Sequence, residues 1–390
     1  MKTRSMVCVC VALLFAMTIG YAQTPATVVL PSVQAANANL GAVIKIDGRI
    51  FTGIIGSQLQ GAYPHTSLVI PDAKLRFTYM PSKDITVVSR LKFSAASGAN
   101  AATPSSMGFD YLYADLNNWA GLIPGHTLRI GRMKIDFGEE TWTDNQVESN
   151  LVSNSVAVPN GYDEGLNFRG PIRKGDHPIN YSLSLLNGTK DLSPAAGAPA
   201  SVVKIGASPI KHLYLSGSYL NTGQLGVNNT DFGVAGITAI PSGATSWQRH
   251  AWEADARWNF GPSGQQANIP TAPTAAVPFV LAAAFGQLAD DSTGAAKRDG
   301  NYWYAEGLYN ITKKIYASAR YSELNLLSGV TAKIADSPVA VSKYQRTSLS
   351  LGYRISALTA IKAEYSINKT DGGATTPKLN QFVLGVATKF

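Results

Sequence analysis

Cysteine is almost absent from this sequence: Cys8 and Cys10 are its only two among 390 residues. Both lie in an N-terminal segment, residues 1–22, that has the features of a cleaved secretory signal. We therefore expect the mature chain to carry no thiol. This excludes disulfide bonds, metal sites built on thiolates and a cysteine nucleophile.

The signal assignment depends on three neighbouring features. Lys2 and Arg4 form a positively charged start, and the apolar run from Val7 to Ile19 follows. Small residues at Gly20 and Ala22 suit signal peptidase, so we expect cleavage before residue 23. The apolar run is too short for a membrane-spanning helix, and a buried first helix is the less favoured interpretation.

Long apolar runs and dense charge are also missing. After residue 22 no stretch approaches the roughly 20 apolar residues that a membrane helix needs. Charged residues make up only 15% of the chain, and the formal net charge of +8 falls to +6 without Lys2 and Arg4. The positive charge is spread along the chain without a dense basic run, so nucleic acid is excluded as the expected partner.

What the sequence does contain is strict alternation of apolar and polar residues. In residues 249–260, Trp252 and Trp258 lie on one face of an extended chain, and Glu253 and Asp255 lie on the other. A period of two over 8 to 12 residues is typical of a half-buried β-strand. Sixteen such segments are expected, near 42–56, 72–80, 84–95, 108–117, 126–136, 163–170, 178–187, 201–209, 211–222, 248–260, 277–290, 300–310, 313–325, 343–355, 358–369 and 379–390.

The links between these segments alternate between short and long. Tight links fall at 81–83, 208–210, 311–312 and 356–357, and longer polar or Gly/Ser/Ala/Pro-rich links fall at 57–71, 96–107, 137–162, 188–200, 223–247, 291–299, 326–342 and 370–378. Short turns at one end and long loops at the other are typical of a transmembrane barrel. Residues 261–276 break the rule, being long where a periplasmic turn is expected, and residues 23–41 are expected to be a flexible periplasmic lead-in.

Two further details favour a membrane barrel over a soluble sandwich. Aromatic residues gather at strand ends, as membrane-interface girdles do: Tyr79, Trp258, Phe260, Tyr302, Trp303, Tyr309 and Tyr353. The last segment alternates up to a terminal Phe390, which resembles the signal that the barrel assembly machinery reads in bacterial outer-membrane proteins. The expected fold class is therefore all-β: residues 42–390 form a transmembrane antiparallel β-barrel of about 16 strands.

One stretch of sequence resembles a known family. The segments GHTLRIGRMKIDFGEE (125–140) and GYDEGLNFRG (161–170) are similar to the strands that flank a long loop in the phosphate-selective porin O/P family. The resemblance implies a trimeric, 16-stranded porin in the bacterial outer membrane, in contact with lipid and lipopolysaccharide, whose long third loop folds into the lumen. The link at 137–162, the longest in this sequence, agrees with that layout.

Charged residues on one face of each strand would line the lumen, since the lipid-facing side excludes them. The candidate basic wall is Lys45, Arg49, Lys74, Arg76, Arg90, Lys92, Arg129, Lys134, Arg169, Arg257 and Arg320. The candidate constriction loop is acidic, with Glu139, Glu140, Asp144 and Glu148. Arg129 and Arg132 cannot share a face unless a bulge at Gly131 brings both inward. An acidic loop opposite a basic wall would set up a transverse field that orients polar solutes.

The expected function is passive diffusion of small polar solutes, with a lean towards anions because the wall is net basic. No cofactor is implied, and we expect no enzyme activity because the sequence shows no Ser/His/Asp constellation. A Ca²⁺ site at Glu139, Glu140 and Asp144 is a weaker interpretation of the loop, since its spacing fits no known calcium loop. An outer-membrane adhesin, a barrel enzyme and a soluble secreted all-β protein stay open as alternatives.

Overall fold

A computed structural model of the chain describes residues 43–58, 66–94, 106–119, 121–143, 146–159, 161–188, 199–226, 232–234, 237, 243–260, 277–327, 331–333, 340–373 and 379–390. The expected signal segment 1–22, the lead-in 23–41 and the link 261–276 lie outside these residues. Their assignments stay predictions.

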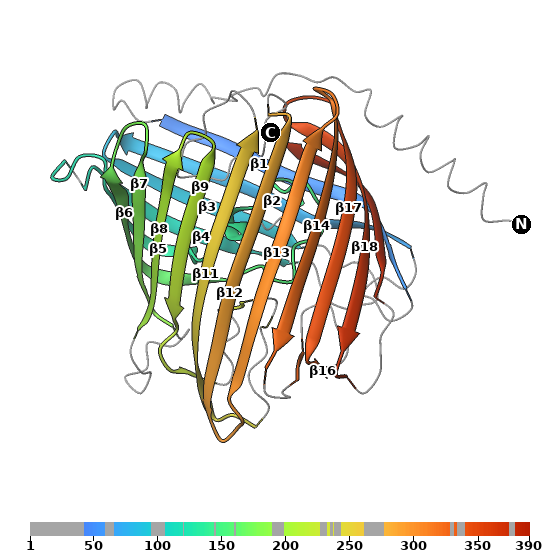
Figure 1. Ribbon diagram of the computed structural model, residues 1–390. Helices are drawn as coiled ribbons and strands as arrows, with labels where there is room; N and C mark the ends of the chain where they lie inside the picture. The colour runs from blue at the N-terminus through green and yellow to red at the C-terminus, as the bar shows by residue number, and fades with distance from the viewer. Residues whose placement is uncertain are drawn as a thin grey trace, which may run out of the picture.

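The described chain is built almost entirely of long β-strands (Figure 1). Those in the first half are β1 (Val43–Ser57), β2 (Ser67–Ser82), β3 (Ile85–Ser94), β4 (Ser106–Asn117), β5 (Thr127–Lys134), β6 (Tyr162–Arg173), β7 (Ile179–Leu186), β8 (Ala200–Ile210) and β9 (Leu213–Asn221). Those in the second half are β11 (Ser246–Phe260), β12 (Phe279–Thr293), β13 (Arg298–Asn310), β14 (Ile315–Leu326), β17 (Lys343–Arg354), β18 (Thr359–Asp371) and β19 (Gln381–Lys389).

Short elements lie in the connections between these strands. They are β10 (Leu225–Gly226), which pairs with β11, the two-stranded β15 (Ala332–Lys333) and β16 (Ala340–Val341), and the 3-10 helix η2 (Glu140–Trp142). No helix among the described residues is both long enough and apolar enough to cross a membrane.

The long strands close into one antiparallel barrel. Each pairs with its neighbour in sequence, and β1 pairs with both β2 and β19, so that the first and last strands join. Closure removes the free edges that an open sheet would expose to lipid, where unpaired backbone groups are costly. The prediction of sixteen strands in an all-β antiparallel barrel is confirmed among the described residues, and every predicted segment overlaps one long strand.

The two faces of the barrel wall differ as a membrane requires. Along β17, Leu349, Leu351 and Tyr353 are 52%, 55% and 43% exposed, whereas Ser348 and Ser350, which alternate with them, are buried. The same inversion recurs around the barrel, since apolar side chains cover its outside and polar ones are packed inside. An apolar exterior and a polar interior are typical of outer-membrane barrels and opposite to soluble folds.

The barrel seam shows a close fit between its two ends. The backbone amide of Gly48 on β1 donates to the carbonyl of Phe390, and that of Phe390 donates to the carbonyl of Gly48. A Cβ on residue 48 would lie 2.4 Å from the Phe390 ring and 2.7 Å from the Lys74 carbonyl. Glycine is therefore required here because the terminal ring packs directly over the β1 backbone.

One member of the predicted aromatic girdle is misplaced. Tyr302 on β13 is fully buried in the barrel interior, where it belongs to the main apolar cluster. Its neighbour Trp303 faces outward and packs against Tyr321 at 5.0 Å between ring centroids. Adjacent residues on a strand point to opposite faces, so only one of these two could join the girdle.

Candidate functional site

A large cavity inside the barrel is the candidate functional site. Its volume is about 1070 Å³, and it extends along β1–β9 and reaches β14, β17, β18 and β19. Among the described residues that line it, ten are basic and three are acidic: Arg49, Arg76, Arg90, Arg129, Lys134, Arg169, Lys204, Arg354, Lys362 and Lys389 against Asp136, Glu139 and Glu148. Six of these ten basic residues belong to the wall that the sequence predicts.

The basic residues on β1–β3 alternate with carboxylates that the sequence prediction did not include. Arg49 Nε lies 2.7 Å from Asp72, and Lys74 Nζ lies 2.6 Å from Asp110. Arg90 also reaches Asp110, at 3.0 Å. The wall therefore partly neutralises itself, because each of these cations shares a carboxylate of its own face.

A β-bulge places one of these carboxylates. The pairing of β3 with β4 shifts between Arg90 and Leu91, so that both Asp110 and Tyr111 reach the inner face. The Arg90 guanidinium lies 4.1 Å from the centre of the Tyr111 ring, in cation–π contact. One extra residue in a strand is enough to turn two successive side chains the same way.

A second basic group sits on β4–β6. Arg129 Nε donates to Asp115 at 2.7 Å, and Arg169 reaches the other oxygen of Asp115 at 3.1 Å. The Arg129 guanidinium also lies 3.5 Å from the centre of the Tyr113 ring. Two arginines share one carboxylate, so this group carries a net positive charge towards the cavity.

Arg132 lies on the outer face, in contrast to Arg129. The β4–β5 register runs without a shift from Leu112 to Asn117, so Gly131 hosts no bulge and the idea that it brings both arginines inward is wrong. Arg132 instead bonds Glu164 at 2.7 Å, on the same face of β5 as the exposed Ile130.

The other predicted wall residues are spread over the barrel. Arg76 bonds Asp47 at 2.7 Å and is half-exposed, and Lys134 donates to the Thr141 carbonyl. By strand alternation Lys45 shares its face with Asp47 and Arg49, and Lys92 shares its face with Arg90. Arg257 lies on the inner face of β11 with Glu253 and Asp255, and Arg320 is buried on β14.

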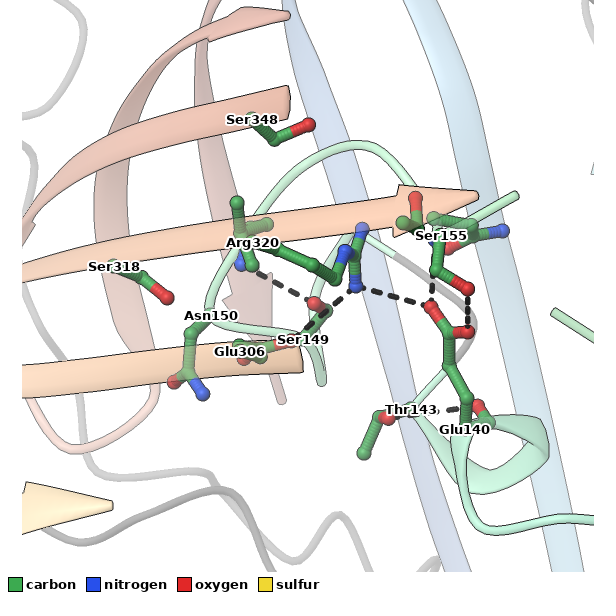
Figure 2. Close-up of polar contacts among 12 residues, drawn as sticks. Glu140, Thr143, Ser149, Asn150, Ser155, Glu306, Ser318, Arg320 and Ser348 are labelled. Carbon is green, nitrogen blue, oxygen red and sulfur yellow. Dashed lines mark hydrogen bonds and ion pairs between the residues drawn. The ribbon is translucent and has the colours of Figure 1, made fainter. Parts of the chain in front are cut away.

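The link between β5 and β6, residues 135–161, bonds to inward-facing side chains and is here named the inner loop. Figure 2 shows its central contact: Arg320 of β14 meets Glu140 at 3.0 Å, and Glu306 of β13 lies 3.3 Å from the same nitrogen. Glu140 is buried and also accepts from the amide of Ser155 at 2.7 Å. Arg320 donates in addition to the Ser153 carbonyl.

Strand β18 provides a second set of contacts for the inner loop. The Lys362 ammonium donates to the carbonyls of Gln146 and Ser149, at 2.7 and 2.5 Å. Two residues further on, the Glu364 carboxylate accepts from the amides of Val152 and Ser153. Lysine and glutamate at alternate positions of one strand thus hold carbonyls and amides of the same loop segment.

The acidic residues of the inner loop face cations. Glu148 bonds Lys389 at 2.6 Å, and Glu139 bonds Lys204 at 2.9 Å. Asp136 also contacts Lys204, at 3.2 Å. Burial alone would raise the pKa of Asp136, but the Lys204 ammonium, the Ser182 hydroxyl and the Arg169 guanidinium together outweigh it and hold that pKa below the ordinary value of 3.8. Asp144, the fourth predicted acidic residue, lies outside the described residues.

These ion pairs weaken the calcium interpretation of the loop. Glu139 and Glu140 are each bound to a basic side chain, Lys204 and Arg320. No cluster of three or more His, Cys, Asp or Glu suited to a metal ion occurs in the described part of the chain.

Sequence reasoning missed several functional side chains. Lys204 is the single charged residue of β8, and Lys362 lies between Ile361 and Ala363 on β18; both are buried and bonded to the inner loop. Their alternation with apolar neighbours was a usable signal for an inward direction. Asp72 and Asp115 lie near predicted basic residues and could have been assigned to the wall by the same alternation. Asp110 could not, because its direction depends on the bulge.

Comparison with known proteins supports the fold. No protein-family model matches the chain, and no curated protein matches it. Among solved structures, the outer-membrane channel DcaP of Acinetobacter baumannii superposes with a TM-score of 0.60 at 13% identity, covering 90% of this chain and 97% of that one. The anion-selective porin from Comamonas acidovorans gives 0.58 at 12% identity, covering 90% and 100%.

A third solved structure is the trimer form of OmpT, an outer-membrane protein of Vibrio cholerae. It gives a TM-score of 0.56 at 10% identity and covers 90% of this chain and 99% of that one. At such low identities the likeness establishes the fold. The chain has the closed 16-stranded barrel of bacterial outer-membrane porins.

Proposed function

We propose that this chain is a porin: a passive, water-filled channel in the bacterial outer membrane for small polar solutes, with a preference for anions. The observation that carries the proposal is the cavity of about 1070 Å³, whose charged lining residues are mostly basic, inside a closed barrel with an apolar exterior. Lipid suits the outside of such a barrel and water suits its inside.

The inner loop is the proposed narrowing of the pathway. Its contacts to Arg320, Lys362 and Glu364 hold it against the wall formed by β14 and β18. Solutes would then pass between this loop and the basic side chains of β1–β6. The size limit follows from the loop and the charge preference from the side chains opposite it.

The preference for anions rests on the charge of the lining. Ten basic residues face three acidic ones around the cavity, although Asp72, Asp110 and Asp115 reduce the excess. The similar structure named as an anion-selective porin supports the same direction. The resemblance of residues 125–140 and 161–170 to the phosphate-selective porin O/P family is compatible with it, but the acidic inner loop argues against strong selection of phosphate.

Reconstitution tests the channel itself. Purified protein in liposomes should let small uncharged sugars enter and cause swelling, and planar bilayers should show stepwise currents that rise linearly with salt concentration. The expected heat-dependent shift on gels would show that the barrel is folded. Folded protein without swelling or current steps would reject the porin proposal and favour an outer-membrane adhesin or a barrel enzyme.

A homotrimer is the proposed assembly, and the outer-face pair Arg132–Glu164 supports it. Trp119, Phe168 and Tyr181 form an aromatic cluster on the outer face towards the short-turn end, which marks one membrane interface. Glu164 lies four residues along β6 from Phe168, on the same face. At about 3.3 Å per residue and a tilt of about 40°, this places the ion pair about 10 Å into the apolar band.

That depth is near the middle of a band about 25 Å tall, where an arginine facing lipid costs about 2–4 kcal/mol. The surface of a second copy would cover the pair with polar groups. A trimer form of OmpT, a structure of the same fold, supports this type of assembly. Replacing Arg132 and Glu164 together by methionine should weaken the trimer in native mass spectrometry. The exchanged pair Arg132→Glu/Glu164→Arg should retain it, and an unchanged trimer in the methionine variant would place the interface elsewhere.

A further inference from the structure

A second loop segment also packs inside the barrel, apart from the inner loop. Phe232, Val234 and Ile237, between β10 and β11, are 2%, 1% and 0% exposed. They belong to one apolar cluster with Phe137 and Val156 of the inner loop. The two loop segments therefore share a core within the barrel.

One arginine holds this second segment in place. Arg249, on the inner face of β11, is fully buried, and one of its terminal nitrogens donates to the carbonyls of Phe232 and Ile237 at 2.7 and 2.9 Å. Its other two nitrogens form a bidentate pair with Asp290 on β12, at 2.7 and 2.9 Å. Asp290 is itself fully buried and is bonded by Arg298 as well.

The bonds of Arg249 join the barrel wall to the loop segment. A buried arginine needs partners for all of its donors, and here two of the acceptors are loop carbonyls rather than wall side chains. The Asp290 carboxylate fixes the fork of the guanidinium, and the remaining nitrogen points at the loop. Trp247 lies under the guanidinium, 5.1 Å away, and closes the site from a third side.

The segment lies on the side of the barrel that the large cavity does not reach. Among the described residues, none from β11, β12 or β13 lines the large cavity. That side of the barrel is occupied instead by the shared core, which includes Trp247, Leu288 and Tyr302 from those strands. If the segment of Phe232, Val234 and Ile237 left this core, the water-filled passage would become wider than the inner loop alone allows.

We propose that Arg249 is a positioning residue that keeps the segment of Phe232, Val234 and Ile237 docked against the inner wall, and that this segment is a second determinant of the solute size limit. The role in the solute size limit rests on the proposed porin function. The docking of the segment by Arg249 does not depend on transport. A hydrogen bond from a charged guanidinium is about twice as strong as one between neutral groups, and this segment accepts two of them.

The docking is tested by thiol labelling. Cys8 and Cys10 are replaced by serine, and Val234→Cys supplies the single thiol, which is buried when the segment is docked. Adding Arg249→Met should speed labelling by a water-soluble maleimide at least about tenfold, because even one charge-assisted hydrogen bond is worth that factor in an equilibrium. The control is Arg298→Met. It also removes a cation from Asp290 but keeps Arg249, which makes the bonds to Phe232 and Ile237, so it should speed labelling less than Arg249→Met.

The effect on size is tested in planar bilayers with neutral polymers of graded size. Arg249→Met should shift the exclusion limit to larger polymers and raise the conductance, and Arg249→Lys should shift it less. Equal labelling of folded wild type and Arg249→Met would overturn the docking, and faster labelling with an unchanged exclusion limit would overturn the size role. A wild type that forms no channel but shows the labelling difference would reject the porin function and leave the docking intact.

Discussion

The contact between Arg320 and the inner loop gives the sharpest prediction for a single side chain. Arg320 is 3% exposed and lies within 3.0 Å of Glu140 and 3.3 Å of Glu306. Arg320→Met would leave both carboxylates without this cation in a site that excludes water. Breaking a buried pair by removing one partner costs about 3–5 kcal/mol.

The loss of this contact can appear either in the stability of the barrel or in the conductance of the channel. If the inner loop stays docked, the free energy of unfolding in urea should fall by about 3–5 kcal/mol. If the loop leaves the wall so that Glu140 reaches water, the loss of stability is smaller, and single-channel traces should show extra conductance and noise. Measuring both quantities on the same protein separates the routes.

Two further variants make the result interpretable. Lys297→Met removes an ion pair whose side chains are more than half-exposed, and it should cost at most about 1 kcal/mol. Arg320→Met combined with Glu306→Gln should recover part of the loss, since one stranded charge is gone. If Arg320→Met resembled Lys297→Met in both stability and conductance, the buried contact would not hold the loop and the reasoning would be refuted.

Other parts of the structure give predictions of the same kind. Leu349 lies midway along β17 on the outer face, so Leu349→Arg should destabilise the barrel in lipid by about 2–4 kcal/mol, whereas Leu349→Ala should cost much less in the same urea titration. Gly48→Val should lower the yield of folded, heat-modifiable barrel, because its side chain would collide with the C-terminal ring; a normal yield would contradict the tight seam. The lowered pKa of Asp136 means that its contact with Lys204 stabilises the fold above the ordinary pKa of 3.8 and is lost as the pH falls through the lowered value. Asp136→Asn should therefore shift the urea midpoint down at pH 7, and the difference from wild type should shrink below about pH 3.8; a difference independent of pH would assign it to packing.

The barrel could be predicted from the sequence because its strands obey a local rule. Side-chain direction alternates with position, so Trp252 outside and Glu253 inside follow from the pattern alone. The same rule placed most of the basic wall on the polar face. It failed where the backbone departs from simple alternation, at the bulge that turns Asp110 and Tyr111 the same way.

The contacts inside the barrel could not be predicted in the same way. Glu140 and Arg320 are 180 residues apart, and no local pattern tells which strand a loop side chain will meet. Arg249 illustrates the point, because its position marks it as a lumen residue but gives no sign that it binds Phe232 and Ile237. Such contacts depend on the path of the loops through three-dimensional space.

The zero-current potential across a planar bilayer in a salt gradient tests the central claim most directly, because its sign reports which ion the lumen prefers. The basic lining predicts that the wild-type potential has the sign of an anion-selective channel. Changing Arg49, Arg90 and Arg169 together to glutamine should shift the potential towards cation selectivity, because the carboxylates that these arginines contact would remain. A wild-type potential set by cations, or a variant potential identical to the wild type, would contradict the assignment of these side chains to the pathway.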